Sequence, residues 1–117
     1  MTTTTTKAAD GSLLEWQAEP APEPMGYDDA RAYAAELGNG WRLPSVPELV
    51  GLWDYAAGAC PTFPTSHGWF WTADRYAGPD VDPSAPSAWA VLFRDGSLDD
   101  TGLTYPAQVR AVRTVQP

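Results

Sequence analysis

The stretch GWRLPSVPELVGL, residues 40–52, contains the features that start a helix and fix the chain leading into it. Ser45 is followed three residues later by Glu48, which is the spacing of a capping box, and Pro47 falls in the first turn, where proline is tolerated. The apolar side chains at positions 46, 49, 50 and 53 recur at helical spacing. We therefore predict a helix that begins after Ser45 and packs one apolar stripe against the core.

The residues before this helix are constrained by Pro44, which disfavours helical backbone at Leu43. Alternate side chains of an extended segment point to opposite sides. Trp41 and Leu43 should therefore press onto the core while Arg42 points elsewhere.

An amphipathic helix is also predicted over residues 27–37. Its first turn carries Asp28 and Asp29, which suit the positive end of the helix dipole, and Gly38 lies just past its end. The apolar positions follow the i, i+3, i+4, i+7 rule and are Ala30, Tyr33, Ala34 and Leu37.

Strands are predicted mainly in the second half of the chain. Aromatic and β-branched residues mark GWFWTA at 68–73 and AWAVLF at 88–93, and Asp95-Gly96 then indicates a hairpin. A last strand, VRAVR, is expected at 109–113, and a short early one at 13–16. Two helices followed by strands predict an α+β domain with two helices packed on one small twisted antiparallel sheet with long loops.

The length of 117 residues predicts a single domain. Residues 1–12 are Thr-rich and polar, so we expect a disordered tail there and the folded domain over 13–117.

The acidic composition limits the classes of partner that this protein can bind. The net charge of −8 and the pI of about 4.3 argue against nucleic acid and anionic membranes. The lone Cys60 cannot form an internal disulfide, and the start lacks the apolar core of a signal peptide. These features predict a cytoplasmic protein. Its oligomeric state, homo- or hetero-oligomer included, stays open.

The order of five segments resembles the Lcl C-terminal domain family, a bacterial domain with a C-type-lectin-like fold related to formylglycine-generating enzyme. The segments are YDDARAYAAEL, GNGWRLPSVPELVGLWD, FPTSHGWFWTA, AWAVLFRDGSL and VRAVR, and the resemblance covers roughly residues 13–114. It implies a ligand face built from the long loops and late strands. Some relatives are adhesins, and others carry residues diversified by retroelements on that face.

The sequence departs from this family at two positions. Where many relatives carry a cysteine in the first helix and another in the closing VR-C-VR, this chain has Ala34 and Ala111. If those positions touch, packing replaces a disulfide that would contribute about 4 to 5 kcal/mol. The formylglycine-generating branch works through cysteine and copper, and Cys60 does not match that motif.

We predict a non-enzymatic binding module for a protein or glycan ligand, recognised through loops and strands of the C-terminal half. Polar and aromatic residues in or beside loops are the candidate contacts. They are Trp69, Arg75, Tyr76, Arg94, Asp95, Asp99, Asp100 and Tyr105. The alternative is a structural or assembly subunit that docks on a neighbour through its Thr-rich N-terminal arm.

We predict structural roles for the other conspicuous residues. The alternatives are that the arginines bind an anion and that a pair of tryptophans stacks on a sugar. Arg42 and Arg110 should each pair with an acid such as Glu48 or Asp54. Trp69 and Trp71 should share one strand face. The residues with predicted structural roles are Trp41, Arg42, Ser45, Glu48, Trp71, Trp89 and Arg110, and the family resemblance implies that Trp71 and Trp89 belong to the core.

No cofactor or metal site is predicted. The acids of the late loops are expected to form a solvated rim, with calcium binding as the alternative, because oxygen ligands suit that ion. These acids are Asp74, Asp80, Asp82, Asp95, Asp99 and Asp100. His67, the only histidine, has no nucleophile or acid at an interpretable spacing, so catalysis is not expected.

Overall fold

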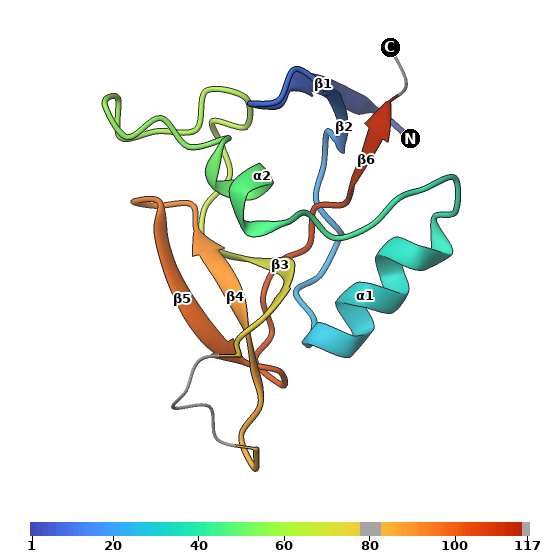
Figure 1. The fold of residues 1–117 in the computed structure, drawn as a ribbon, viewed down its shortest axis with the longest axis vertical. Helices are drawn as coiled ribbons and strands as arrows, with labels where there is room; N and C mark the ends of the chain where they lie inside the picture. Colours follow the sequence, from blue (N-terminus) through green and yellow to red (C-terminus); the bar gives the residue numbers. More distant parts are fainter. Residues whose placement is uncertain (78–82, 116–117) are drawn as a thin grey trace.

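Two three-stranded antiparallel sheets and two helices make up the fold of this protein, as shown by a computed structural model that describes residues 1–77 and 83–115 (Figure 1). One sheet has the order β1-β2-β6 and the other β3-β4-β5. The elements are β1 (Thr3–Lys7), β2 (Leu13–Gln17), α1 (Tyr27–Glu36), α2 (Val46–Val50), β3 (Trp69–Arg75), β4 (Ser87–Leu92), β5 (Ser97–Gly102) and β6 (Val112–Val115). The α+β class is confirmed, and the single sheet is replaced by two.

The N-terminal segment differs from the predicted disordered tail, because Thr3–Lys7 forms strand β1 along the whole of β2. Threonine is β-branched and suits a strand at a sheet edge. The Trp16 indole N–H donates to Thr6 Oγ1 at 2.9 Å, which ties the strand to a buried ring. Residues 3–7 are therefore part of the folded domain.

The last strand begins later than predicted, at Val112 instead of 109. Residues 107–111 are extended but change partners from residue to residue, so they form no continuous ladder. Ala107 pairs with Met25, the Val109 carbonyl accepts from Ala21, and Gln108 pairs in parallel with Phe70. This segment bonds to β3 through Gln108 and leads directly into β6, so it links the two sheets.

A first core cluster lies between α1 and the β3-β4-β5 sheet. The predicted apolar positions Ala30 and Ala34 of α1 are fully buried in it. Ala34 and Ala111, the two positions at which the family resemblance implies cysteines in many relatives, both belong to this cluster. Across from the helix, the sheet contributes Trp71, Ala88 and Ala90.

A second core cluster lies between α2 and both sheets. Leu14 and Trp16 come from β2, and Phe70 and Val91 come from β3 and β4. From α2 and the chain after it come Leu49, Leu52 and Trp53. The sheet β3-β4-β5 is therefore covered by a cluster on each face, one beneath each helix.

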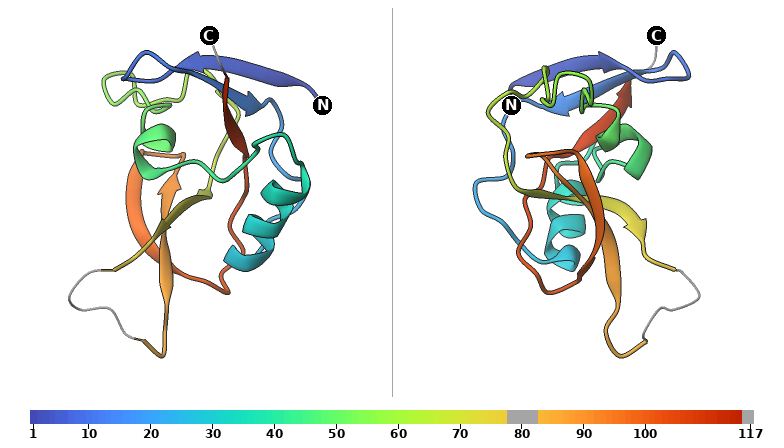
Figure 2. Two further views of the ribbon diagram at one scale, coloured as in Figure 1. Left: turned by 45° about the vertical axis from the view of Figure 1, so that its right-hand side comes forward. Right: turned by 90° about the vertical axis from the view of Figure 1, so that its left-hand side faces the viewer.

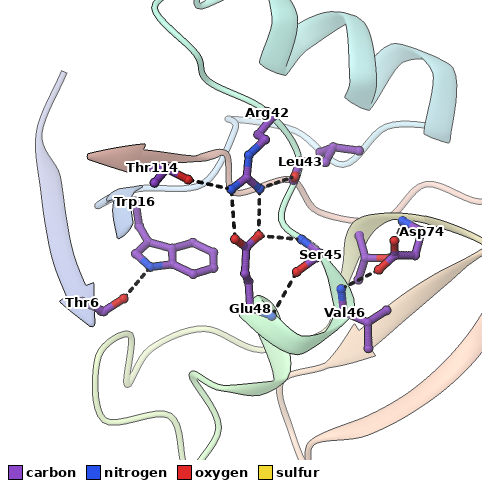
Figure 3. A network of polar contacts seen from close by, with 10 residues as sticks. Thr6, Trp16, Arg42, Leu43, Ser45, Val46, Glu48, Asp74 and Thr114 are labelled. Atoms are coloured by element: carbon purple, nitrogen blue, oxygen red, sulfur yellow. Dashed lines mark hydrogen bonds and ion pairs between the residues drawn. The ribbon is translucent and has the colours of Figure 1, made fainter. Parts of the chain in front are cut away.

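The stretch 40–52 contributes to both clusters, and the predicted alternation of Trp41 and Leu43 with Arg42 is confirmed. Trp41 and Leu43 are buried in the first cluster, and Leu49 is buried in the second. Between them Arg42 points outward and pairs with Glu48 through two hydrogen bonds of 2.7 and 2.9 Å (Figure 3). The predicted capping box between Ser45 and Glu48 is present.

The turn between β4 and β5 is locked against the second cluster. Gly96 has a φ of +76°, and a Cβ there would lie 2.4 Å from Cδ1 of Trp53. The Tyr55 hydroxyl donates to the Gly96 carbonyl at 2.9 Å. This end of the hairpin is held beside α2, while the opposite end at Ser87 extends away from the β1-β2-β6 sheet (Figures 1 and 2).

Replacing Gly96 by alanine should lower the free energy of unfolding by about 2 to 5 kcal/mol. Left-handed backbone costs about 1 to 2 kcal/mol for a residue with a Cβ, and overpacking against Trp53 adds about 1 to 3 kcal/mol. Chemical denaturation measures the change. The matched control is Gly58→Ala, which has a φ of +65° but no atom within 4 Å of the added Cβ. If the free energy of unfolding fell equally in the two variants, overpacking against Trp53 would contribute nothing.

Replacing Glu48 by glutamine should lower stability at neutral pH by about 0.5 to 1 kcal/mol, because glutamine keeps the capping geometry and loses the ion pair. Burial raises the pKa of Glu48, but bonds from Arg42 and Ser45 outweigh it, so the net pKa lies below 4.5. A carboxyl with a depressed pKa stabilises the fold above its unfolded pKa and loses that effect as the pH falls through the folded value.

The stability difference between wild type and Glu48→Gln should therefore shrink as the pH falls below about 4.5 and vanish once the carboxyl of Glu48 is protonated. Thermal unfolding followed by circular dichroism over that pH range measures it. A difference that stays constant with pH would show that the charge of Glu48 contributes nothing.

Candidate ligand-binding site

The structure separates the eight predicted contact residues, and the four in two adjacent pairs lie at opposite ends of the β4-β5 hairpin. Arg94 and Asp95 lie in the turn beside α2. Arg75 and Tyr76 lie at the other end, where β3 finishes next to the start of β4. The eight residues therefore do not form one surface.

Four side chains lie near Ser87 at the end of the sheet opposite the β4-β5 turn, and we call Arg75, Tyr76, Trp89 and Asp100 the end patch. The Ser87 carbonyl accepts from the Tyr76 backbone N–H at 3.0 Å and from the Arg75 side chain at 3.4 Å. The Ser87 hydroxyl donates to Asp100 at 3.2 Å. A single buried serine of β4 therefore bonds to residues at the end of β3 and to one residue of β5.

Within the end patch, Tyr76, Trp89 and Asp100 present one face. Trp89 is directly opposite Asp100 in the antiparallel ladder, so both side chains point to the same side of the sheet. The rings of Tyr76 and Trp89 meet edge to face with centroids 5.3 Å apart. Arg75 turns toward the α1 side, where its guanidinium lies 5.8 Å from the Tyr27 ring.

Trp89 was predicted as core, and that prediction is wrong. Its neighbours Ala88 and Ala90 are fully buried on the α1 side, whereas Trp89 is half-buried on the opposite face. Strand alternation between two small buried residues could have indicated this. Ser87 is not among the predicted contact residues. Its carbonyl and hydroxyl bond to residues that are distant in the sequence, so no local sequence pattern indicates these contacts.

Three other predicted contacts lie outside the end patch. Trp69 packs against the first core cluster on the same side as Trp71, as the shared strand face predicts. Asp99 is exposed and lies opposite Ala90, on the other face of β5 from Asp100. Tyr105 is 47% exposed and follows Gly102, the ladder partner of Ser87, by three residues.

In the turn, Asp95 has a local role. Its carboxylate accepts from both the backbone N–H and the hydroxyl of Ser97, and these bonds lower its pKa. Asp95 therefore shapes the hairpin, and together with Arg94 it lies far along the strand from the end patch.

Among the residues with predicted structural roles, Trp41 and Trp71 are buried and Arg42 pairs with Glu48 as predicted. Arg110 is buried, but the prediction that it pairs with an acid is wrong. It donates instead to the carbonyls of Gln17 and Ala18 and to the Ser66 hydroxyl.

The acids do not assemble a metal site in the part of the chain that the structure describes, where no group of three His, Cys, Asp or Glu side chains could hold an ion. Asp74 instead accepts from the Val46 N–H at 2.7 Å, at the first turn of α2. Asp80 and Asp82 lie outside the described residues. His67 is exposed, and its carbonyl accepts from Gln108.

These features define a small α+β domain with a mixed aromatic and acidic patch at one end of a sheet. The chain belongs to the Lcl C-terminal domain family, which it matches over residues 5–113, β1 included in part. A comparison with curated proteins found no match. No described helix has the length and apolar character needed to cross a membrane.

Proposed function

We propose that this protein is a non-enzymatic recognition module with a C-type-lectin-like fold, and that its protein or glycan ligand contacts the end patch and Tyr105. The observation that carries the proposal is the half-exposed pair of Tyr76 and Trp89 beside Asp100. Aromatic rings with adjacent polar groups are the usual anchors of recognition surfaces and offer faces on which a sugar or peptide can stack.

The geometry favours this end of the sheet over the turn. At the turn, the Trp53 ring packs against Gly96, and the Tyr55 hydroxyl donates to the Gly96 carbonyl. Both side chains are therefore used in contacts within the domain. At the Ser87 end, β5 is an edge strand, and its residue Asp100 is exposed. A ligand there meets side chains that are positioned by Ser87.

The alternative role, docking on a neighbour through a free N-terminal arm, would require β1 to leave the sheet. Thr3–Lys7 pairs with β2 over all five residues, and Thr6 accepts from Trp16. Removing residues 1–12 would therefore alter the fold itself, which disfavours a role as a free docking arm.

The test uses glycan and peptide arrays probed with the purified chain, followed by titration of the best ligand. Tyr76→Ala and Tyr105→Ala should each weaken binding about tenfold or more, the loss typical of an aromatic anchor. Both variants should keep a native near-ultraviolet circular dichroism spectrum, which shows that they fold.

The matched control is Tyr55→Ala, because Tyr55 is also exposed, at 61%, but lies at the opposite end of the hairpin. Its binding should equal that of wild type. If Tyr55→Ala weakens binding while Tyr76→Ala and Tyr105→Ala do not, the ligand face lies at the turn and the proposal is wrong.

A further inference from the structure

Strand β5 is an open edge of the β3-β4-β5 sheet. On its inner side, all six of its residues pair with β4 in antiparallel register. On its outer side, no further strand pairs with it among residues 1–77 and 83–115 (Figure 1). The opposite edge of the sheet is occupied, because the Trp71 N–H of β3 donates to the Gln108 carbonyl at 3.0 Å. A further strand can therefore be added beside β5.

Successive residues of β4 direct their backbone groups to opposite neighbours. The Ser87 carbonyl accepts from the Tyr76 N–H at 3.0 Å, on the β3 side. One position earlier, the Pro86 carbonyl accepts from the Leu103 N–H at 3.3 Å, on the β5 side. Because this alternation continues along an antiparallel ladder, the even-numbered residues of β4 direct their backbone groups to β5.

The alternation of β4 decides which backbone groups of β5 face outward. The ladder partners of the even-numbered residues of β4 are Ser97, Asp99 and Thr101. The residues between them, Leu98 and Asp100, therefore direct their N–H and C=O groups to the open edge. Among the described residues, no loop or other strand bonds to these groups. Two donors and two acceptors thus lie in one line along the strand.

The side chains along this edge are open to solvent and include an apolar one. Leu98 is 42% exposed, and Asp99 and Asp100 are also exposed. No ion pair among the described residues includes either acid. Edge strands that must stay unpaired are commonly interrupted by proline or a bulge, whereas β5 contains no proline and pairs with β4 without a register shift. An uninterrupted edge with an exposed leucine suits pairing with another chain.

The two acids decide which chain can pair with β5. If β5 paired with β5 of a second copy, the two antiparallel registers of longest overlap would place Asp99 or Asp100 opposite itself. Like charges directly opposite each other are destabilising, and the net charge of −8 adds repulsion between copies. Arginine or lysine at the opposing positions would instead be attracted to both carboxylates. The edge therefore favours a basic partner over self-association.

We propose that β5 binds an extended, basic segment of a partner protein as an added antiparallel strand. The partner residues opposite Leu98 and Asp100 exchange backbone hydrogen bonds with them. In the chain direction of the partner, the matching sequence is basic, basic, apolar, which sets cations opposite Asp100 and Asp99 and an apolar side chain opposite Leu98. The inference rests on the proposed function, because Asp100 belongs to the end patch, and it specifies the ligand as a peptide.

The test follows the backbone amides of the full chain by ¹⁵N nuclear magnetic resonance during titration with the peptide acetyl-Thr-Arg-Lys-Val-Thr-amide. The amides of Leu98 and Asp100 should shift downfield and saturate, because each gains an acceptor. Those of Asp99 and Thr101 should move less, because they already bond to β4. A peptide with glutamate in place of its two basic residues should bind about tenfold more weakly, since two attractions become repulsions. Shifts without this alternation along β5, or equal binding of the two peptides, would overturn the proposal.

Backbone-methylated peptides separate strand addition from charge attraction on the unaltered protein. N-methylation of the peptide's arginine or valine removes an N–H that donates to the Asp100 or Leu98 carbonyl and places a methyl group against β5, so it should weaken binding about tenfold or more. N-methylation of the peptide's lysine, whose N–H faces away from β5, should leave binding within about twofold of the parent peptide. Equal losses at the three positions would overturn the added strand.

Protein variants distinguish a failure of this inference from a failure of the proposed function. Asp99→Asn, outside the end patch, should weaken peptide binding about two- to fivefold, the effect of one exposed ion pair. The matched control Glu36→Gln removes an exposed acid of α1 and should bind as wild type does. If Tyr76→Ala loses an array ligand while the peptide leaves the β5 amides unmoved, the inference is wrong and the proposed function stands. A dimer of the chain alone whose β5 amides shift on dilution would identify a second copy as the occupant and overturn the inference.

Discussion

The two-way backbone pairing of Arg42 with Val112 is the constraint on which the rest of this structure depends. Each residue donates its N–H to the carbonyl of the other at 2.9 Å. The pairing fixes which way the flanking side chains point, so Trp41 and Leu43 enter the first core cluster while Val112 enters the second. The Arg42 side chain then reaches Glu48 and Thr114 and fixes the start of α2. Two clusters that share no residue are thereby held in one domain.

This arrangement explains why the two ends of the β4-β5 hairpin differ. The turn is packed under Trp53, which belongs to the second cluster and cannot move without disturbing α2. The other end is fixed by the small contacts of Ser87, which position Tyr76 and Asp100 and leave them partly open to solvent. A recognition surface needs such side chains on a rigid base. Arg110 lies over the Phe63 ring of the second cluster, and its buried Nε–H has no acceptor.

The sequence predicted those features that local chemistry decides. The capping box at Ser45, the apolar stripe of α1 and the hairpin at Asp95-Gly96 each follow from residues a few positions apart. A second hairpin dipeptide, Asp10-Gly11, lies between β1 and β2 and is the local signal that indicates β1. The split into two sheets, the exposure of Trp89 and the unpaired Arg110 depend on contacts between distant segments. The distance along the hairpin between Asp95 in the turn and Tyr76 at the other end has the same origin.

Native-state hydrogen exchange of Leu43→Ala tests most directly the claim that the stretch 40–52 joins both cores. Leu43 is buried in the first cluster only, and its truncation should cost about 2 to 5 kcal/mol. If the junction couples the clusters, the amides of β2 and of β4 should lose protection by the same free energy, since both sheets open as one cooperative unit. Loss of protection in β4 with unchanged protection in β2 would contradict the account.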